Sequence, residues 1–168
     1  MNKRYGRFGW SKGSLLNFCI GQGEILVTPI QVFNYVNLLA TKGNSNSPHL
    51  VSSTKKDSEN EIPLSSQIWD RIIFDMRQVV SHAKGTGKNA DPAIQGAEIY
   101  GKTGTAENPH GEDHAWFIGW VEYEKKKFSI VVLLENSGSG GAVAAPLAKN
   151  VFDKIILGID NSKQISMK

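Results

Sequence analysis

The chain has little of several features that define common protein classes. Cys19 is its only cysteine in 168 residues, which excludes an internal disulfide framework and a metal cluster built on several cysteines. The longest uninterrupted aliphatic run is 130–134, far shorter than the ~20 residues that cross a bilayer. No basic segment followed by an apolar one opens the sequence, so we expect no signal peptide or membrane anchor within it.

The excess of positive over negative charge is also small. The formal net charge is +3, and the Lys and Arg residues are scattered along the chain. The sequence therefore predicts no surface for nucleic acid. Apolar residues make up 40% and charged residues 21%, which is typical of a globular chain rather than a disordered or fibrous one. The length predicts one domain or a large piece of one.

Three segments have the apolar period of helices. The first begins with a capping box between Thr28 and Gln31 and is predicted to stop at Gly43. The second, which has the clearest period, is predicted to begin at residue 65 or 66 and to end at Gly85. The third covers 143–158. These helices flank the segment that carries the strand patterns.

Strand patterns occur at 98–107, 115–123 and 128–135, and the short basic connection at Lys125 and Lys126 predicts that the last two form a hairpin. Both faces of the middle strand are apolar. The side chains that share one face are Trp116, Ile118 and Trp120, and those on the other are Phe117 and Val121. We infer an α+β fold, with helices packed on both faces of an antiparallel sheet.

The remaining segments carry no regular period. We interpret 1–13 as an irregular lead-in, 14–158 as the folded part and 159–168 as a loose tail. A short strand is expected at Pro48–Val51, followed by an exposed polar loop at 52–61.

The strongest chemical motif is Lys102-Thr103-Gly104, which lies in the first predicted strand and is followed by Thr105. At the border of a cleft, such a strand could direct an ammonium, two hydroxyls and a backbone N–H at a carboxylate and at a carbonyl that becomes an oxyanion. Gly104 has no side chain, so a substrate or a facing helix can approach the backbone closely.

Further motifs stand in an order that one family shares. They are Ile20-Gly21-Gln22-Gly23, Thr28-Pro29-Ile30-Gln31, Gly85-Thr86-Gly87, 101–107, 114–120, Gly140-Gly141 and Ala145-Pro146. From Asn17 to Leu157 the chain resembles the C-terminal part of the transpeptidase domain of class B penicillin-binding proteins. The resemblance implies the β-lactamase/transpeptidase fold. It also implies cross-linking of peptidoglycan stem peptides through an acyl-serine intermediate, with no metal or organic cofactor.

The resemblance implies a role for each residue of the motif. Lys102 would hydrogen-bond the hydroxyl of the family's middle motif and lend positive charge to the cleft. Thr103 and Thr105 would contact the carboxylate of a D-Ala-D-Ala stem peptide, or of the β-lactam that mimics it. The N–H of Thr105 would be one of two oxyanion donors, and the other would belong to the nucleophilic serine.

The sequence departs from the family at the nucleophile. The family has Ser-x-x-Lys at the start of a buried helix and Ser-x-Asn well downstream, both before Lys-Thr-Gly. Ser52-Ser53-Thr54-Lys55 and Ser58-Glu59-Asn60 have these spellings. They are nearly adjacent, however, and they lie in a charged stretch where a lysine stays solvated. We therefore expect this chain to hold part of an active site without its nucleophile.

Three alternative readings stay open. His110 and His114 could hold zinc for a hydrolase, although Pro109 and Gly111 argue against a shared helix face. Cys19 could be a nucleophile, although its apolar neighbours are typical of a small buried side chain. The chain could also be a non-enzymatic interaction module.

The resemblance also bears on partners and location. In the family the sheet continues with strands from the N-terminal half of the domain, so we expect one uncovered sheet edge here. Such an edge favours a homo-oligomer, with segment exchange as one route. Family members work outside the cytoplasmic membrane, which implies a periplasmic or cell-envelope location.

We predict that the chain alone does not react with penicillin, because its sequence places no serine beside a desolvated lysine base. Intact-mass spectrometry after incubation should show unmodified protein. A stoichiometric acyl adduct would contradict this, and an adduct on Ser52 would restore the motif at 52–55.

Overall fold

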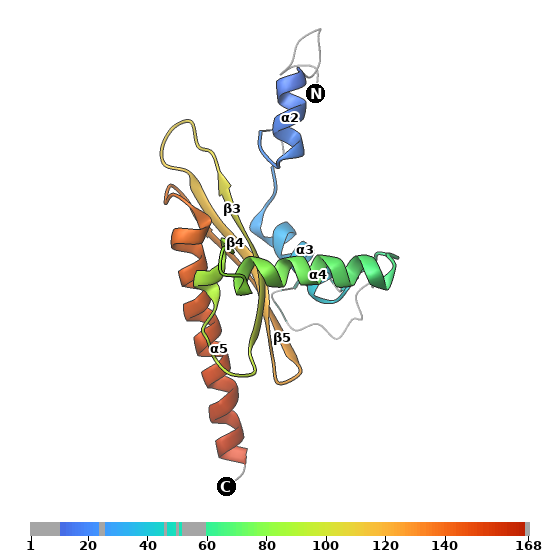
Figure 1. Ribbon diagram of the computed structural model, residues 1–168, viewed down its shortest axis with the longest axis vertical. Coiled ribbons are helices and arrows are strands. Elements are labelled where there is room, and N and C mark those ends of the chain that lie inside the picture. Colours follow the sequence, from blue (N-terminus) through green and yellow to red (C-terminus); the bar gives the residue numbers. More distant parts are fainter. Residues whose placement is uncertain (1–10, 24–25, 46, 50, 52–59, 167–168) are drawn as a thin grey trace.

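The computed structural model describes residues 11–23, 26–45, 47–49, 51 and 60–166 (Figure 1). The elements, in chain order, are α2 (Lys12–Cys19), α3 (Pro29–Ala40), β1 (Asn44–Ser45), β2 (Asn60–Glu61), α4 (Ser66–Ser81), the 3-10 turn η2 (Lys88–Ala90), β3 (Glu98–Ala106), β4 (His114–Tyr123), β5 (Lys126–Leu134), the π-helical turn η3 (Gly140–Ala144) and α5 (Ala145–Ser166). No helix among the described residues is both long enough and apolar enough to cross a bilayer.

The main sheet is antiparallel, with the strand order β3-β4-β5. Helices α3 and α4 lie on one side of it and α5 on the other (Figure 1). The α+β class and the helices on both faces are therefore confirmed. A two-residue turn at Glu124 and Lys125, both with positive φ, joins β4 to β5. This turn matches the twist of paired strands, and it confirms the predicted hairpin.

The pleat of β4 directs its side chains into two separate cores, as the alternation predicts. On the α5 side, Phe117 and Val121 are fully buried in one cluster with Phe152 and Ile156. On the opposite side, Trp120 is fully buried with residues of α3 and α4. Burial of each such side chain contributes about 1.5–3 kcal/mol, so the two cores hold the sheet from both faces.

An aromatic pair anchors β3 to β4 on the side of α3 and α4. The rings of Tyr100 and Trp120 stack with their centroids 4.9 Å apart. The Tyr100 hydroxyl donates to Glu98 at 2.9 Å, and the Trp120 indole N–H donates to Glu122 at 3.1 Å. Burial, followed by the hydrogen bond to Glu98, raises the pKa of Tyr100 above its ordinary value. The phenol therefore keeps its proton and continues to donate even in alkaline solution, where an ordinary tyrosine would begin to ionise.

The helix starts were predicted better than the helix ends. The capping box is present, since the Thr28 N–H donates to the Gln31 side chain and the Gln31 N–H to the Thr28 hydroxyl. Helix α4 begins after Ser65, as expected, but it ends at Ser81 rather than at Gly85. The chain turns back there, and the Gly87 N–H donates to the Val79 carbonyl at 2.9 Å.

Both predicted terminal segments need correction. Helix α2 begins inside the expected lead-in of 1–13, with the Ser11 hydroxyl accepting from the Ser14 N–H as its cap. Helix α5 continues through Gly158 to Ser166, so most of the expected tail is helical. A glycine typically ends a helix by adopting a left-handed conformation, with positive φ. Gly158 has no positive φ, so the helix continues through it.

The expected strand at Pro48–Val51 is also wrong for the residues that the structure describes, which are Pro48, His49 and Val51. The strand of this region is β1, which precedes the expected strand in the sequence and pairs with β2 in a short antiparallel ribbon. Of the expected loop at 52–61, the structure describes only 60–61, which form β2; 52–59 lie outside the described residues.

The close packing of β3 on β4 predicts contrasting effects for two glycine substitutions. In Gly119→Ala, the new Cβ would collide with the Tyr100 carbonyl oxygen and lie 2.9 Å from the Gly101 Cα. We expect a loss of about 3 kcal/mol in the free energy of unfolding, measured by urea denaturation. The matched control is Gly158→Ala in α5, where no atom lies within 4 Å of the new Cβ. It should gain about 0.5–1 kcal/mol. Equal stabilities of the two variants would contradict this packing.

Candidate functional site

The described part of the chain provides β3 with only one strand partner, β4, so its other edge is open to side chains and ligands. Three carbonyls on this edge accept hydrogen bonds from side chains. They are Ile99 from Arg77 at 3.1 Å, Thr103 from Lys102 at 2.7 Å and Thr105 from Gln22 at 3.2 Å. Alternate residues of an antiparallel strand direct their backbone groups to the same edge. The Thr105 N–H therefore also lies on the open edge.

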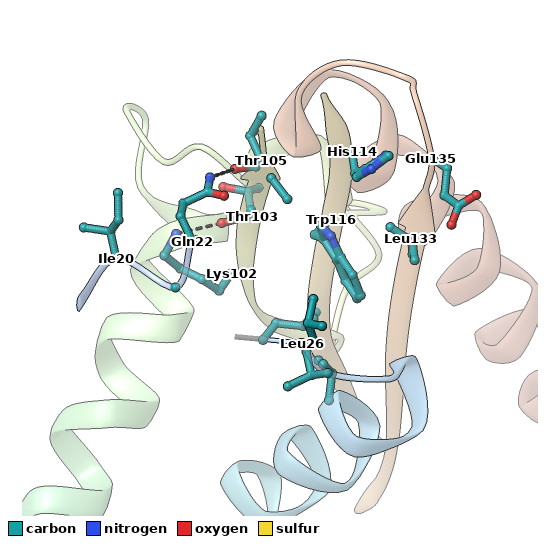
Figure 2. Close-up of a pocket in the computed structure, with 16 residues that line it drawn as sticks. Ile20, Gln22, Leu26, Lys102, Thr103, Thr105, His114, Trp116, Leu133 and Glu135 are labelled. Carbon is teal, nitrogen blue, oxygen red and sulfur yellow. Dashed lines mark hydrogen bonds between the residues drawn. The ribbon is translucent and has the colours of Figure 1, made fainter. Parts of the chain in front are cut away.

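The register with β4 assigns the motif side chains to two faces of the sheet. Thr103 lies opposite Phe117 and Thr105 opposite Ala115, so both hydroxyls are on the face that α5 covers. Lys102 lies opposite Ile118, on the face of α3. Its ammonium reaches the Thr103 carbonyl at the open edge (Figure 2). The ammonium therefore reaches the edge from one face of the sheet, and the two hydroxyls lie on the other face.

Each threonine hydroxyl has a partner on another segment. The Thr103 and Thr86 hydroxyl oxygens are 2.8 Å apart. The Thr105 hydroxyl oxygen accepts from the Gly140 N–H at 3.5 Å. These partners come from the loop after α4 and from η3, which are far from β3 in sequence. Three of the sequence motifs therefore converge at one end of the strand.

This convergence requires residues without side chains. A Cβ on Gly140 would collide with the carbonyl oxygens of Trp116 and Gly104, and a Cβ on Gly141 would lie 2.5 Å from the Thr86 carbonyl oxygen. Only glycine allows η3 to pack this closely against the backbone of β3, β4 and the loop after α4. The two glycines thereby fix the position of the hydroxyl partners.

A groove of about 600 Å³ runs beside the motif (Figure 2). Residues 102–106 line it along β3, and Trp116, Ile118 and Leu133 contribute from the same face of the sheet. Ile20 and Leu26 line it from the segment before α3, and both are largely exposed. The groove is therefore mostly apolar. Its polar lining residues are Lys102, Thr103 and Thr105 on β3 and Gln22, His114 and Glu135 on other segments, and a few polar groups in an apolar groove are typical of a site that orients a ligand.

The structure places two other candidates differently from the sequence analysis. Cys19 was interpreted as a small buried side chain, but it is exposed, because α2 buries none of its residues. Trp116 was expected in the core with Phe117 and Trp120, but it is only half-buried and lines the groove. Both errors have the same cause. An apolar side chain is buried only where another segment packs against it, and the apolar period in the sequence does not show whether such a segment is present.

The alternative zinc site receives no support from the geometry. His114 uses its Nδ1 to accept the backbone N–H of Asn136 at 3.0 Å, and His110 lies in the exposed turn before β4. In the described ranges no three His, Cys, Asp or Glu side chains gather as metal ligands would. The serine spellings at 52–55 and 58–59 lie outside the described residues, and Asn60 begins β2. The missing nucleophile therefore stays a prediction.

Gln22 and Thr86 contact the motif strand, although no sequence pattern predicted a function for either of them. Each is a polar residue between two glycines, Gly21 and Gly23 in one case and 85 and 87 in the other. A polar side chain flanked by glycines is a signal for a backbone that approaches another segment closely. That signal is present in the sequence, but it does not say which segment is approached.

Comparison with known proteins agrees with this architecture. The family model described as "Penicillin binding protein transpeptidase domain" matches residues 2–153. The peptidoglycan D,D-transpeptidase MrdA of Haemophilus influenzae is 34% identical over 176 residues, which cover 90% of this chain and 27% of that protein. The peptidoglycan D,D-transpeptidase PbpA of Mycobacterium tuberculosis is 33% identical over 161 residues, covering 83% of this chain and 31% of that protein. The chain spans less than a third of these relatives.

Solved structures show the same fold. Pseudomonas aeruginosa PBP2, in complex with WCK 5153, matches with a TM-score of 0.76 and 35% identity, covering 90% of this chain and 34% of that one. Penicillin-binding protein A of M. tuberculosis, as its imipenem acyl-enzyme complex, matches with a TM-score of 0.71 and 28% identity, covering 87% of this chain and 34% of that one. With its sheet, motif strand and family match in agreement, the chain belongs to the penicillin-binding protein transpeptidase family, of whose domain it forms a part.

Proposed function

We propose that this chain forms one wall of the active-site cleft of a peptidoglycan D,D-transpeptidase. In this proposal the wall binds the terminal carboxylate of a D-Ala-D-Ala stem peptide, or the carboxylate of a β-lactam that mimics it. The observation that carries the proposal is the open edge of β3. It brings the Lys102 ammonium to the border of a groove that residues 103–105 also line, while the hydroxyls of Thr103 and Thr105 lie on the opposite face of the same strand.

The chemistry of these groups suits a carboxylate. An ionised carboxylate only accepts hydrogen bonds, and a threonine hydroxyl or a lysine ammonium can donate to it. Bonds to a charged acceptor are about twice as strong as neutral ones. The outward backbone groups of β3 suit an extended peptide, which could add to the edge as a further strand. The groove would then hold the side chains of that peptide.

The same edge supports a role for the Thr105 N–H in stabilising the oxyanion. This N–H points away from β4, where no strand in the described part of the chain pairs with it, and it could donate to the oxyanion that forms when a nucleophile attacks the peptide carbonyl. The serine and its base would come from a part of the relatives that this chain does not match, since it covers 27% of one and 34% of the other. The imipenem acyl-enzyme of the M. tuberculosis relative supports acylation by β-lactams as the family reaction. A location in the cell envelope follows from the same proposal.

The carboxylate proposal predicts the effect of removing one charge. Lys102→Met keeps the length of the side chain but removes the ammonium. It should weaken binding of N-acetyl-D-alanyl-D-alanine, followed by NMR titration, by about fivefold, because a charge near the carboxylate contributes about 1 kcal/mol at an exposed site. The peptide with an amide terminus should bind both proteins equally. Lys154→Met, on the exposed face of α5, is the matched control. Equal weakening by both variants would contradict the role of Lys102.

We also propose that a second copy of the chain pairs with β5. No strand within the described ranges pairs with its outer edge over the nine residues of β5, and residues 130–134 are all aliphatic. An open, apolar edge is a template for another strand. Sedimentation velocity should therefore show a species heavier than the 18.4 kDa monomer that grows with concentration. A compact monomer at the highest attainable concentration would contradict this pairing.

A further inference from the structure

Thr86 is held in a fixed position against the motif strand. The loop that carries it returns to α4, where the Gly87 N–H donates to the Val79 carbonyl at 2.9 Å. On its other side, Gly141 packs against the Thr86 carbonyl oxygen. The Thr86 hydroxyl oxygen then lies 2.8 Å from the Thr103 hydroxyl oxygen. A backbone held at both sides gives this hydroxyl pair a defined geometry, although the Thr86 side chain itself is exposed.

The number of protons in this pair has a chemical consequence. A hydroxyl donates one hydrogen bond and accepts two. If Thr103 donates to Thr86, it has no proton left for another acceptor. If Thr86 donates to Thr103, the Thr103 proton is free. A carboxylate bound at Thr103 can only accept, so its binding requires the second arrangement.

We propose that Thr86 is a positioning residue that donates its hydroxyl proton to Thr103 and thereby directs the Thr103 proton at the ligand carboxylate. This inference rests on the proposed function, because it assigns a cause to the donor role of Thr103. Thr86 acts through Thr103 and needs no contact of its own with the ligand. A hydroxyl that accepts one bond donates a stronger one, so the relay also strengthens the bond to the carboxylate.

Thr105 has the same arrangement with a different partner. The Gly140 N–H that approaches its hydroxyl oxygen at 3.5 Å can only donate. The Thr105 hydroxyl is therefore the acceptor in this contact and keeps its own proton. Both threonines thus receive a hydrogen bond from a segment behind the strand. The two free protons are left for one acceptor at the open edge.

The test compares three substitutions. Thr86→Val preserves the shape of the side chain and removes the hydroxyl, Thr86→Ser retains the hydroxyl, and Ser81→Ala removes a hydroxyl that bonds only within α4. Loss of one neutral hydrogen bond should weaken binding of N-acetyl-D-alanyl-D-alanine by about threefold to tenfold in Thr86→Val. Binding should be unchanged in Ser81→Ala and restored in Thr86→Ser. The amide-terminated peptide should not distinguish the variants.

A double-mutant cycle separates positioning from a general structural effect. If Thr86 acts only through Thr103, then Thr86→Val should have no further effect on the affinity of a Thr103→Val protein. An additive loss in the double variant would overturn the inference, since it would mean that Thr86 affects binding independently. Equal affinity of Thr86→Val and the parent protein would overturn it as well.

A measurement without ligand keeps the inference distinct from the proposed function. Three-bond NMR couplings from the Thr103 methyl carbon report its side-chain rotamer. We expect one rotamer in the parent and in Thr86→Ser, and an average of rotamers in Thr86→Val. Failure of the parent chain to bind the peptide would count against the proposed function, and the couplings alone would then decide the role of Thr86. An unchanged Thr103 rotamer in Thr86→Val overturns the inference in either case.

Discussion

The site depends on the fact that, among the residues that the structure describes, β3 pairs with a strand on one side only. The backbone groups of a strand in the middle of a sheet form hydrogen bonds with two neighbouring strands. In β3, by contrast, the carbonyls of Ile99, Thr103 and Thr105 point away from β4. Unpaired backbone groups are unfavourable unless water, a side chain or a ligand satisfies them. Here side chains of the same molecule reach the three carbonyls, while the edge stays accessible from the groove. In the function that we propose, this edge is the surface that binds the ligand and sets its direction.

A second constraint is the close approach of two glycine-containing segments behind that edge. The loop after α4 and the turn η3 reach the hydroxyls of Thr103 and Thr105 only because no Cβ stands between the backbones at Gly140 and Gly141. The packing of α5 on β4 holds η3 in place from the other side. Sheet, loop and helix therefore act together, and the orientation of two small hydroxyls depends on the burial of large apolar side chains some distance away.

Local signals in the sequence predicted the elements that local physics determines. The capping box at Thr28, the period of α4 and the alternation of β4 each depend on residues a few positions apart, and the structure agrees with all three. The errors concern partners distant in sequence. Cys19 is exposed because nothing in the described chain covers α2, and Trp116 borders a groove whose other wall lies some ninety residues earlier. The contacts of Gln22 and Thr86 were missed for the same reason, because spacing in a sequence does not show which segments meet.

The central claim is that the open edge of β3 is where this chain holds a carboxylate-bearing peptide. The most direct measurement is a map of amide chemical-shift changes in the isotope-labelled chain as N-acetyl-D-alanyl-D-alanine is added. The account predicts that the largest changes occur at 103–105, with smaller ones at Thr86 and Gly140, which lie behind the strand, and none along the outer face of α5. Changes centred on another surface, such as the hollow between α3 and residues 47–49, with β3 unaffected, would contradict it.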